Sequence, residues 1–219
     1  MKGLGTNDTQ LIWILVSRSE TDLPAIKGQY QQLYGQSLKS DVEKETSGDY
    51  KKALIRIIDK VGEEKPIPKE KEHKNTEKQE ADEKKEGEKT DNDKQIVHTK
   101  EEIEIESNEN KIDENDEDAV KLNKAMKGFG TKEDVVIEVI TRNSNSQRQT
   151  LKMRYNELYK KDLVEDLKSE LSGDFKDTIL ALMMSPINLD IDTLNSSMKG
   201  LGTDEPTLIG IICSKSAAE

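Results

Sequence analysis

Apolar side chains recur with a helical period in several short segments of this chain. Between residues 118 and 126 they stand at Ala119, Leu122 and Met126, the spacing of one helix face. Similar stripes predict further helices over residues 135–140, 151–158, 163–171 and 175–184, and Pro186 is expected to end the last of these. No segment alternates as a half-buried strand would. The pattern therefore predicts an all-α fold.

The chain also repeats itself. Met1-Lys2-Gly3-Leu4-Gly5-Thr6 recurs in closely similar form at residues 126–131 and 198–203. The first two copies are offset by 125 residues and the last two by 72, and the difference of 53 is close to the length of a charged segment between them. We infer a unit of about 72 residues, built of five short helices, with a long charged linker inserted once. Because the chain starts at a glycine loop and ends inside a unit, we expect it to be a fragment.

The charge is concentrated in that linker. Residues 63–118 hold 22 acidic and 11 basic side chains, whereas the rest of the chain holds 23 of each. We expect the linker to be a solvated, disordered tether and the folded part to be neutral. A neutral surface without a Lys/Arg block argues against binding to nucleic acid. The two histidines, His73 and His98, also lie in the charged segment, which leaves no material for a histidine-based zinc site or catalytic triad.

Single residues narrow the picture further. Cys213 is the one cysteine, so no internal disulfide can form, which fits a reducing compartment. It ends an apolar run from residue 208, and we expect it to be buried as a small hydrophobic side chain. Trp13 is expected to pack between helices rather than to anchor in lipid. No apolar run approaches the ~20 residues needed to span a bilayer.

The repeated glycine loop joins two predicted helices, and we expect Thr131 with Asp134 to form a capping box for the second of them. The loop lacks the third glycine of a dinucleotide fingerprint and the Gly-Lys-Ser/Thr of a phosphate-binding loop. Two glycines separated by one residue instead allow positive φ and outward carbonyl oxygens, which are hard ligands suited to calcium.

A carboxylate follows each of the first two loops at the same distance. Glu45 and Glu170 both stand 44 residues after the methionine that opens their loop, just before a Ser-Gly-Asp turn. Taken separately, the glycines are explained as helix C-caps and the glutamates as solvated side chains. Their joint repetition favours a cation site built from loop carbonyls and one carboxylate.

These features resemble the annexin family, whose members bind anionic phospholipid in a calcium-dependent manner. The Met-Lys-Gly-x-Gly-Thr loop, the acid 44 positions on and the Ser-Gly-Asp-Tyr/Phe turn carry the resemblance, which covers nearly everything outside the linker. It implies annexin-type repeats and Ca²⁺ bound by backbone carbonyls and a carboxylate. The implied ligands are Met1, Gly3, Gly5 and Glu45 in the first loop, Met126, Gly128, Gly130 and Glu170 in the second, and Met198, Gly200 and Gly202 in the third. Thr131 and Glu133 would form a weaker accessory site.

The resemblance also orders the units. Residues 1–62 are similar to a fourth annexin repeat without its first helix, and residues 63–115 form the linker. Residues 116–187 are similar to a complete first repeat and residues 188–219 to the start of a second. This order resembles the junction of the two cores of an eight-repeat annexin. Arg18, which the family keeps for structural reasons, aligns with Asn143, while Arg142 stands one place earlier.

The implied function is peripheral, reversible membrane binding in the cytoplasm, with anionic phospholipid as the partner. Two cores on a long tether would be able to bridge membranes through avidity. The alternative is a calcium-insensitive helical scaffold or cytoskeleton-associated protein, which the presence of Glu45 and Glu170 disfavours. An enzyme is not expected, since no nucleophile–base pair or catalytic metal motif is visible.

Overall fold

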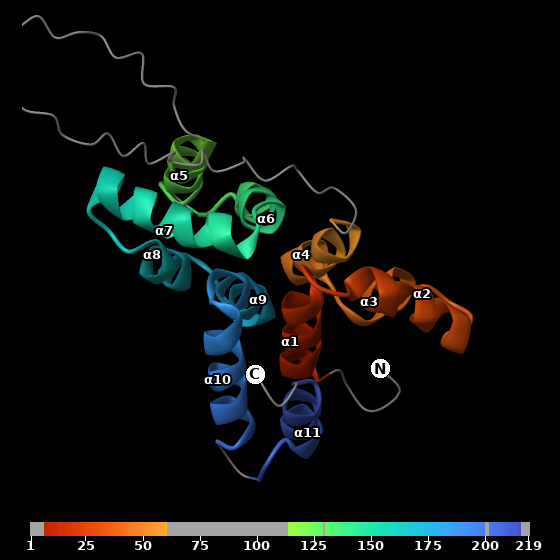
Figure 1. The fold of residues 1–219 in the computed structure, drawn as a ribbon. Helices are drawn as coiled ribbons and strands as arrows, with labels where there is room; N and C mark the ends of the chain where they lie inside the picture. The colour runs from red at the N-terminus through yellow and green to blue at the C-terminus, as the bar shows by residue number, and fades with distance from the viewer. Residues whose placement is uncertain (1–6, 61–113, 129, 200–201, 216–219) are drawn as a thin grey trace, which may run out of the picture. The chain divides into compact units, whose positions relative to one another are not determined.

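A computed structural model describes residues 7–60, 114–128, 130–199 and 202–215 (Figure 1). Within these ranges the chain forms eleven helices and no strand, which confirms the all-α prediction. The helices are α1 (Asp8–Arg18), α2 (Leu23–Tyr34), α3 (Leu38–Glu45), α4 (Gly48–Asp59), α5 (Glu114–Ala125), α6 (Glu133–Arg142), α7 (Asn145–Tyr159), α8 (Leu163–Glu170), α9 (Gly173–Met183), α10 (Pro186–Ser197) and α11 (Glu205–Cys213). Most of the predicted linker, with His73 and His98, lies outside the described residues.

One complete five-helix unit runs from α5 to α9. In it α5 packs against α6 and α7, and α9 packs against α6, α7 and α8. The stripes that predicted these helices form its core, where Leu122, Ile140, Leu151 and Leu167 are each fully buried. Burying a side chain of this size contributes about 1.5–3 kcal/mol, so the core accounts for the order of these short helices.

A buried tyrosine fixes the position of α7 in this unit. The hydroxyl of Tyr155 donates a hydrogen bond to Asp166 Oδ2 at 2.8 Å and accepts one from Asn123 Nδ2 at 3.1 Å. In the first unit, Tyr30 makes the matching bond to Asp41 Oδ2 at 2.9 Å, again with a separation of 11 residues along the chain. The internal repeat of the sequence is thus also a repeat of specific polar contacts.

The helices before and after the charged segment pack together. Helix α4 contacts α6 and α9, and α1 contacts α9 and α10. Arg148 of α7 is 2% exposed and donates hydrogen bonds to the carbonyls of Leu182, Ile140 and Asn143. A further guanidinium nitrogen lies 3.1 Å from Glu20 Oε1. A buried cation that is paired and hydrogen-bonded in this way ties four segments together.

One prediction about helix ends was wrong, that of the Thr131 cap, and the other, that the helix over residues 175–184 ends before Pro186, was confirmed. Helix α6 begins at Glu133, and its N-cap is Lys132, which makes no side-chain cap. Thr131 therefore stands one residue too early to cap it, and Asp134 lies 2.9 Å from Lys52 Nζ instead. Pro186 follows the end of α9 but occupies the first turn of α10, where its fixed φ suits a helix start.

Cys213 is exposed, which contradicts the prediction that it is buried. Its counterpart 72 residues earlier, Thr141, is 1% exposed in α6, against which α9 packs. Among the described residues nothing equivalent to α9 covers α11, so its apolar face stays open at Ile209 and Ile212. Trp13 is 4% exposed and donates to Asp190 Oδ1 at 2.9 Å, which confirms its role in packing between helices.

The contact of Lys60 with the five-helix unit predicts that the stability of the fold depends on pH. Lys60 Nζ donates to the carbonyl oxygen of Asn143 at 2.6 Å, and burial, with the nearby Arg148 charge, lowers its pKa to about 8 against the opposing influence of Glu20. Between that value and the unfolded pKa of about 10.4, the unfolded chain holds a proton that the folded chain has lost. Stability should therefore rise with pH across this window.

Urea unfolding of the parent and of Lys60→Met, each at pH 8 and pH 10, measures how the free energy of unfolding changes with pH in the two proteins. The parent should gain about 1 kcal/mol relative to the variant, a figure reduced for the partial exposure of the side chain. Subtracting the variant's change from the parent's cancels the contribution of groups that both proteins contain. Tyr30 and Tyr155, whose pKa values burial raises to about 12, are two of these groups. Parallel pH profiles of the two proteins would contradict the prediction.

Candidate functional site: a glycine loop and a carboxylate

The second glycine loop leaves α5 and enters α6 through a backbone conformation that favours glycine. Gly128 and Gly130 have φ values of 119° and 89°, a region that side-chain-bearing residues rarely adopt. The Lys132 N–H donates to the Ala125 carbonyl oxygen at 2.9 Å and closes the loop at its base. The glycines are thus required by the turn, as the sequence suggested.

The third loop has the same construction. Gly202 has a φ of 102°, and the Asp204 N–H donates to the Ser197 carbonyl oxygen at 2.8 Å. Both residues of that hydrogen bond stand 72 positions after their counterparts in the second loop. The described parts of the two copies therefore share a closing hydrogen bond and a glycine of positive φ.

Glu170 lies beside the second loop. It is the last residue of α8 and is exposed, and its Oε2 accepts a hydrogen bond from the Thr131 hydroxyl at 2.9 Å. The two residues are 39 positions apart, so the fold brings together a loop and an acid that the sequence only paired by their spacing. Met126 is 8% exposed, so its side chain belongs to the core and only its backbone is available to a ligand.

The other predicted sites are described only in part. Met1, Gly3, Gly5 and Gly200 lie outside the described residues. Glu45 is the exposed last residue of α3, as Glu170 is of α8. Met198 is 58% exposed at the end of α10, and its loop has no glutamate within the sequence to match Glu170.

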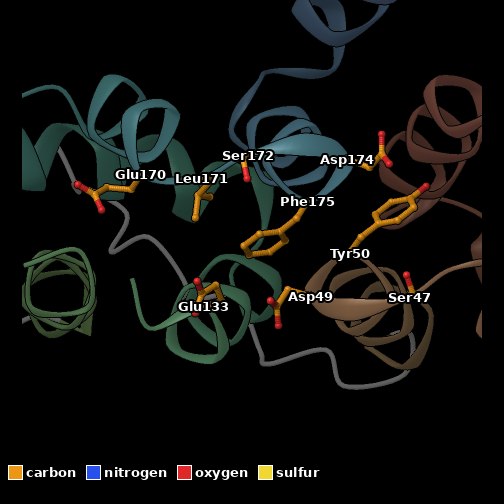
Figure 2. Close-up of a pocket in the computed structure, with 9 residues that line it drawn as sticks. All are labelled: Ser47, Asp49, Tyr50, Glu133, Glu170, Leu171, Ser172, Asp174 and Phe175. Atoms are coloured by element: carbon orange, nitrogen blue, oxygen red, sulfur yellow. The ribbon is translucent and has the colours of Figure 1, made fainter. Parts of the chain in front are cut away.

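A hollow of about 310 Å³ opens next to Glu170 (Figure 2). Both Ser-Gly-Asp turns line it, one from the start of α4 and one from the start of α9, together with Glu133 of α6. Burial, reinforced by the charges of Asp8 and Asp177, raises the pKa of Asp174 above its ordinary value. The sequence pattern did not predict this hollow, although the turn repeated at residues 47–49 and 172–174 is a signal for it.

The donor set around the loop suits a hard cation. Within the described ranges no group of three or more His, Cys, Asp or Glu side chains is placed to hold a metal. A cation at the loop would therefore need backbone oxygens in addition to Glu170, and oxygen-only coordination is what Ca²⁺ prefers. The residues present fit that ion.

The comparisons with known proteins identify the family. The family model "Annexin" matches residues 1–57 and 117–182. The chain belongs to the annexin family. This annexin is 39% identical to mouse annexin A6 over its whole length and covers 31% of that protein. It is 52% identical to human annexin A11 over 99 residues, which are 45% of this chain and 20% of the relative.

Solved annexin structures have the same fold. The structure named annexin III superimposes with a TM-score of 0.72 at 30% identity, covering 98% of this chain and 55% of that one. Chicken annexin V gives 0.67 at 25% identity, covering 97% and 55%. In sequence, this annexin chain spans about a third of the length of annexin A6. In the part that the structure describes, no helix is long and apolar enough to cross a membrane.

The loop geometry predicts opposite effects for two Gly→Ala substitutions. An added Cβ meets nothing within 4 Å at either Gly128 or Gly28, so only backbone conformation distinguishes them. At Gly128 the positive φ should make alanine cost about 1–2 kcal/mol of unfolding free energy. Inside α2, alanine at Gly28 should instead stabilise by about 0.5–1 kcal/mol. Urea unfolding measures the free energy of unfolding of both variants. A neutral or stabilising Gly128→Ala would show that the loop does not require a positive φ at this position.

Proposed function

We propose that this annexin binds anionic phospholipid membranes in a calcium-dependent manner through the closed glycine loops. The observation that carries the proposal is the contact of Glu170 with the loop at Thr131. The carbonyls of Met126, Gly128 and Gly130 would hold Ca²⁺ together with the Glu170 carboxylate. When bound, the ion supplies positive charge and open coordination positions for lipid phosphate.

The charge balance of the protein supports a requirement for the ion. Helix α5 begins at Glu114, so the sequence outside residues 61–113 holds 27 acidic and 23 basic side chains rather than equal numbers. This net negative charge gives no attraction for an anionic membrane without the ion. One carboxylate neutralises half the charge of a calcium ion, which leaves positive charge facing the lipid. Calcium and lipid would then strengthen each other's binding by the same factor.

The remaining predicted ligands belong to the same proposal. Glu45 with the carbonyls of Met1, Gly3 and Gly5 would form an equivalent site, and Thr131 with Glu133 a weaker accessory one. The third loop would contribute carbonyls of Met198, Gly200 and Gly202. The function is one of binding rather than catalysis, and the association would be peripheral, reversible and cytoplasmic.

Replacing Glu170 tests the proposal. Sedimentation with phosphatidylserine vesicles should pellet the 219-residue chain with calcium and leave it in solution with chelator. Glu170→Gln removes the ligand charge but keeps the shape, and it should raise the calcium needed for half-maximal pelleting on the order of tenfold. Glu45→Gln with Glu170→Gln should weaken pelleting further.

Glu165→Gln is the matched control, because Glu165 is an exposed residue of the same short helix. It should pellet like the parent. Pelleting that ignores calcium, or that responds equally to both glutamine substitutions, would reject the site. Absence of pelleting in either condition would favour the helical scaffold instead.

Membrane bridging is a finer hypothesis, and the structure bears on how it would work. The contact of Arg148 with Glu20 and the packing of α4 on α9 hold the two sides of the charged segment together. The segment can act as a tether between two cores only if those contacts open or if further repeats carry the second membrane.

Deleting residues 70–105 tests whether the charged segment acts as a tether. If the segment is a tether, the deletion should reduce calcium-dependent vesicle aggregation, measured as turbidity, while leaving pelleting intact. Equal aggregation by the parent and the shortened chain would contradict the tether hypothesis.

A further inference from the structure

We propose that Thr131 is a positioning residue for the loop site, holding the Glu170 carboxylate against the loop before the cation arrives. This inference rests on the proposed function and assigns one residue its part in it. The sequence predicted Thr131 as a helix cap, and the resemblance implied an accessory ligand. The hydroxyl does not cap α6, because it stands outside the N-cap and donates to Glu170 Oε2 at 2.9 Å.

Glu170 needs such a constraint. It is an exposed residue at the end of an eight-residue helix, and a glutamate there is free to sample several rotamers. Among the described residues, Thr131 is the only side chain that hydrogen-bonds to it. The bond engages one carboxylate oxygen and leaves Oε1 for a ligand.

Ordering the carboxylate in advance lowers the cost of binding. Partners that orient a ligating carboxylate typically contribute 10–100-fold to metal affinity. Because this contact is exposed and single, we expect the lower end, roughly tenfold. The hydroxyl should matter for calcium affinity while contributing little to the stability of the calcium-free fold.

The chain offers a matched control in Thr203. It occupies the position of Thr131 in the third loop, 72 residues later, and it is exposed. The acid that would correspond to Glu170 is not part of the sequence. Thr203→Val therefore makes the same chemical change in the same kind of loop without a carboxylate to release.

The test is calcium titration by calorimetry, without lipid, on the full 219-residue chain carrying Glu45→Gln to silence the first loop. Thr131→Val keeps the shape of threonine and should weaken binding roughly tenfold. Thr131→Ser should restore affinity to within about threefold, and Thr203→Val should have no effect. Thermal unfolding in chelator should be the same for all four proteins.

Two further backgrounds separate positioning from accessory coordination. With Glu170→Gln, Thr131→Val should cause no additional loss, because its partner is already neutralised. With Glu133→Gln, the full effect of Thr131→Val should persist. An effect that instead disappears with Glu133→Gln would assign Thr131 to the accessory site and overturn the inference.

The remaining outcomes are also decisive. Unchanged affinity in Thr131→Val, or equal loss in Thr131→Val and Thr131→Ser, would reject a role for the hydroxyl while leaving the proposed function standing. A parent that binds no calcium would reject the proposed function itself, and the positioning role with it.

Discussion

Helices too short to be stable alone are the constraint on which this structure depends. The described helices run from 8 to 15 residues, a length at which an isolated helix is marginal in water. Each therefore persists because its apolar stripe is covered by neighbours, as α5 is covered by α7. The ends of such helices are set by tertiary contacts as much as by local signals, and the loop site is built at those ends.

The candidate site follows from this arrangement of helix ends. The loop leaves the end of α5, Glu170 stands at the end of α8, and the hollow lies between the starts of α4 and α9. The loop, Glu170 and the start of α4 are far apart in sequence, and only the turn before α9 directly follows Glu170. The third loop closes between α10 and α11, the only helices of its own unit that are described, whereas a carboxylate held by Thr131 requires α8 to be packed beside the second loop.

The sequence predicted the helices and the pairing of loop with acid because both are periodic. Apolar stripes repeat within a helix, and Glu45 and Glu170 repeat between units, so each signal is present twice. What it could not predict are contacts made once. The burial of Arg148 and its bond to Glu20 depend on two units packing together, and no local pattern encodes that.

Substitutions at corresponding positions show a second limit. Asp118, 1% exposed, pairs with both Arg142 and Asn143, so the displaced arginine still reaches the buried acid. Arg142, one place before the aligned position, pairs with one oxygen of Asp118, and Asn143 at the aligned position donates to the other. Position along the chain is therefore a weaker guide than the group that needs a partner.

The two units also differ where their turns face the hollow. In the first, the Tyr50 hydroxyl donates to Asp8 Oδ1 at 2.9 Å, whereas the counterparts 125 residues on are Phe175 and Glu133. Phenylalanine has no donor, so Glu133 lacks the bond that holds Asp8 and lines the hollow beside Glu170. The carboxylate that follows the repeated loop is thus held by a phenol in the first unit and lacks that bond in the second, so equivalent sequence does not give equivalent surroundings.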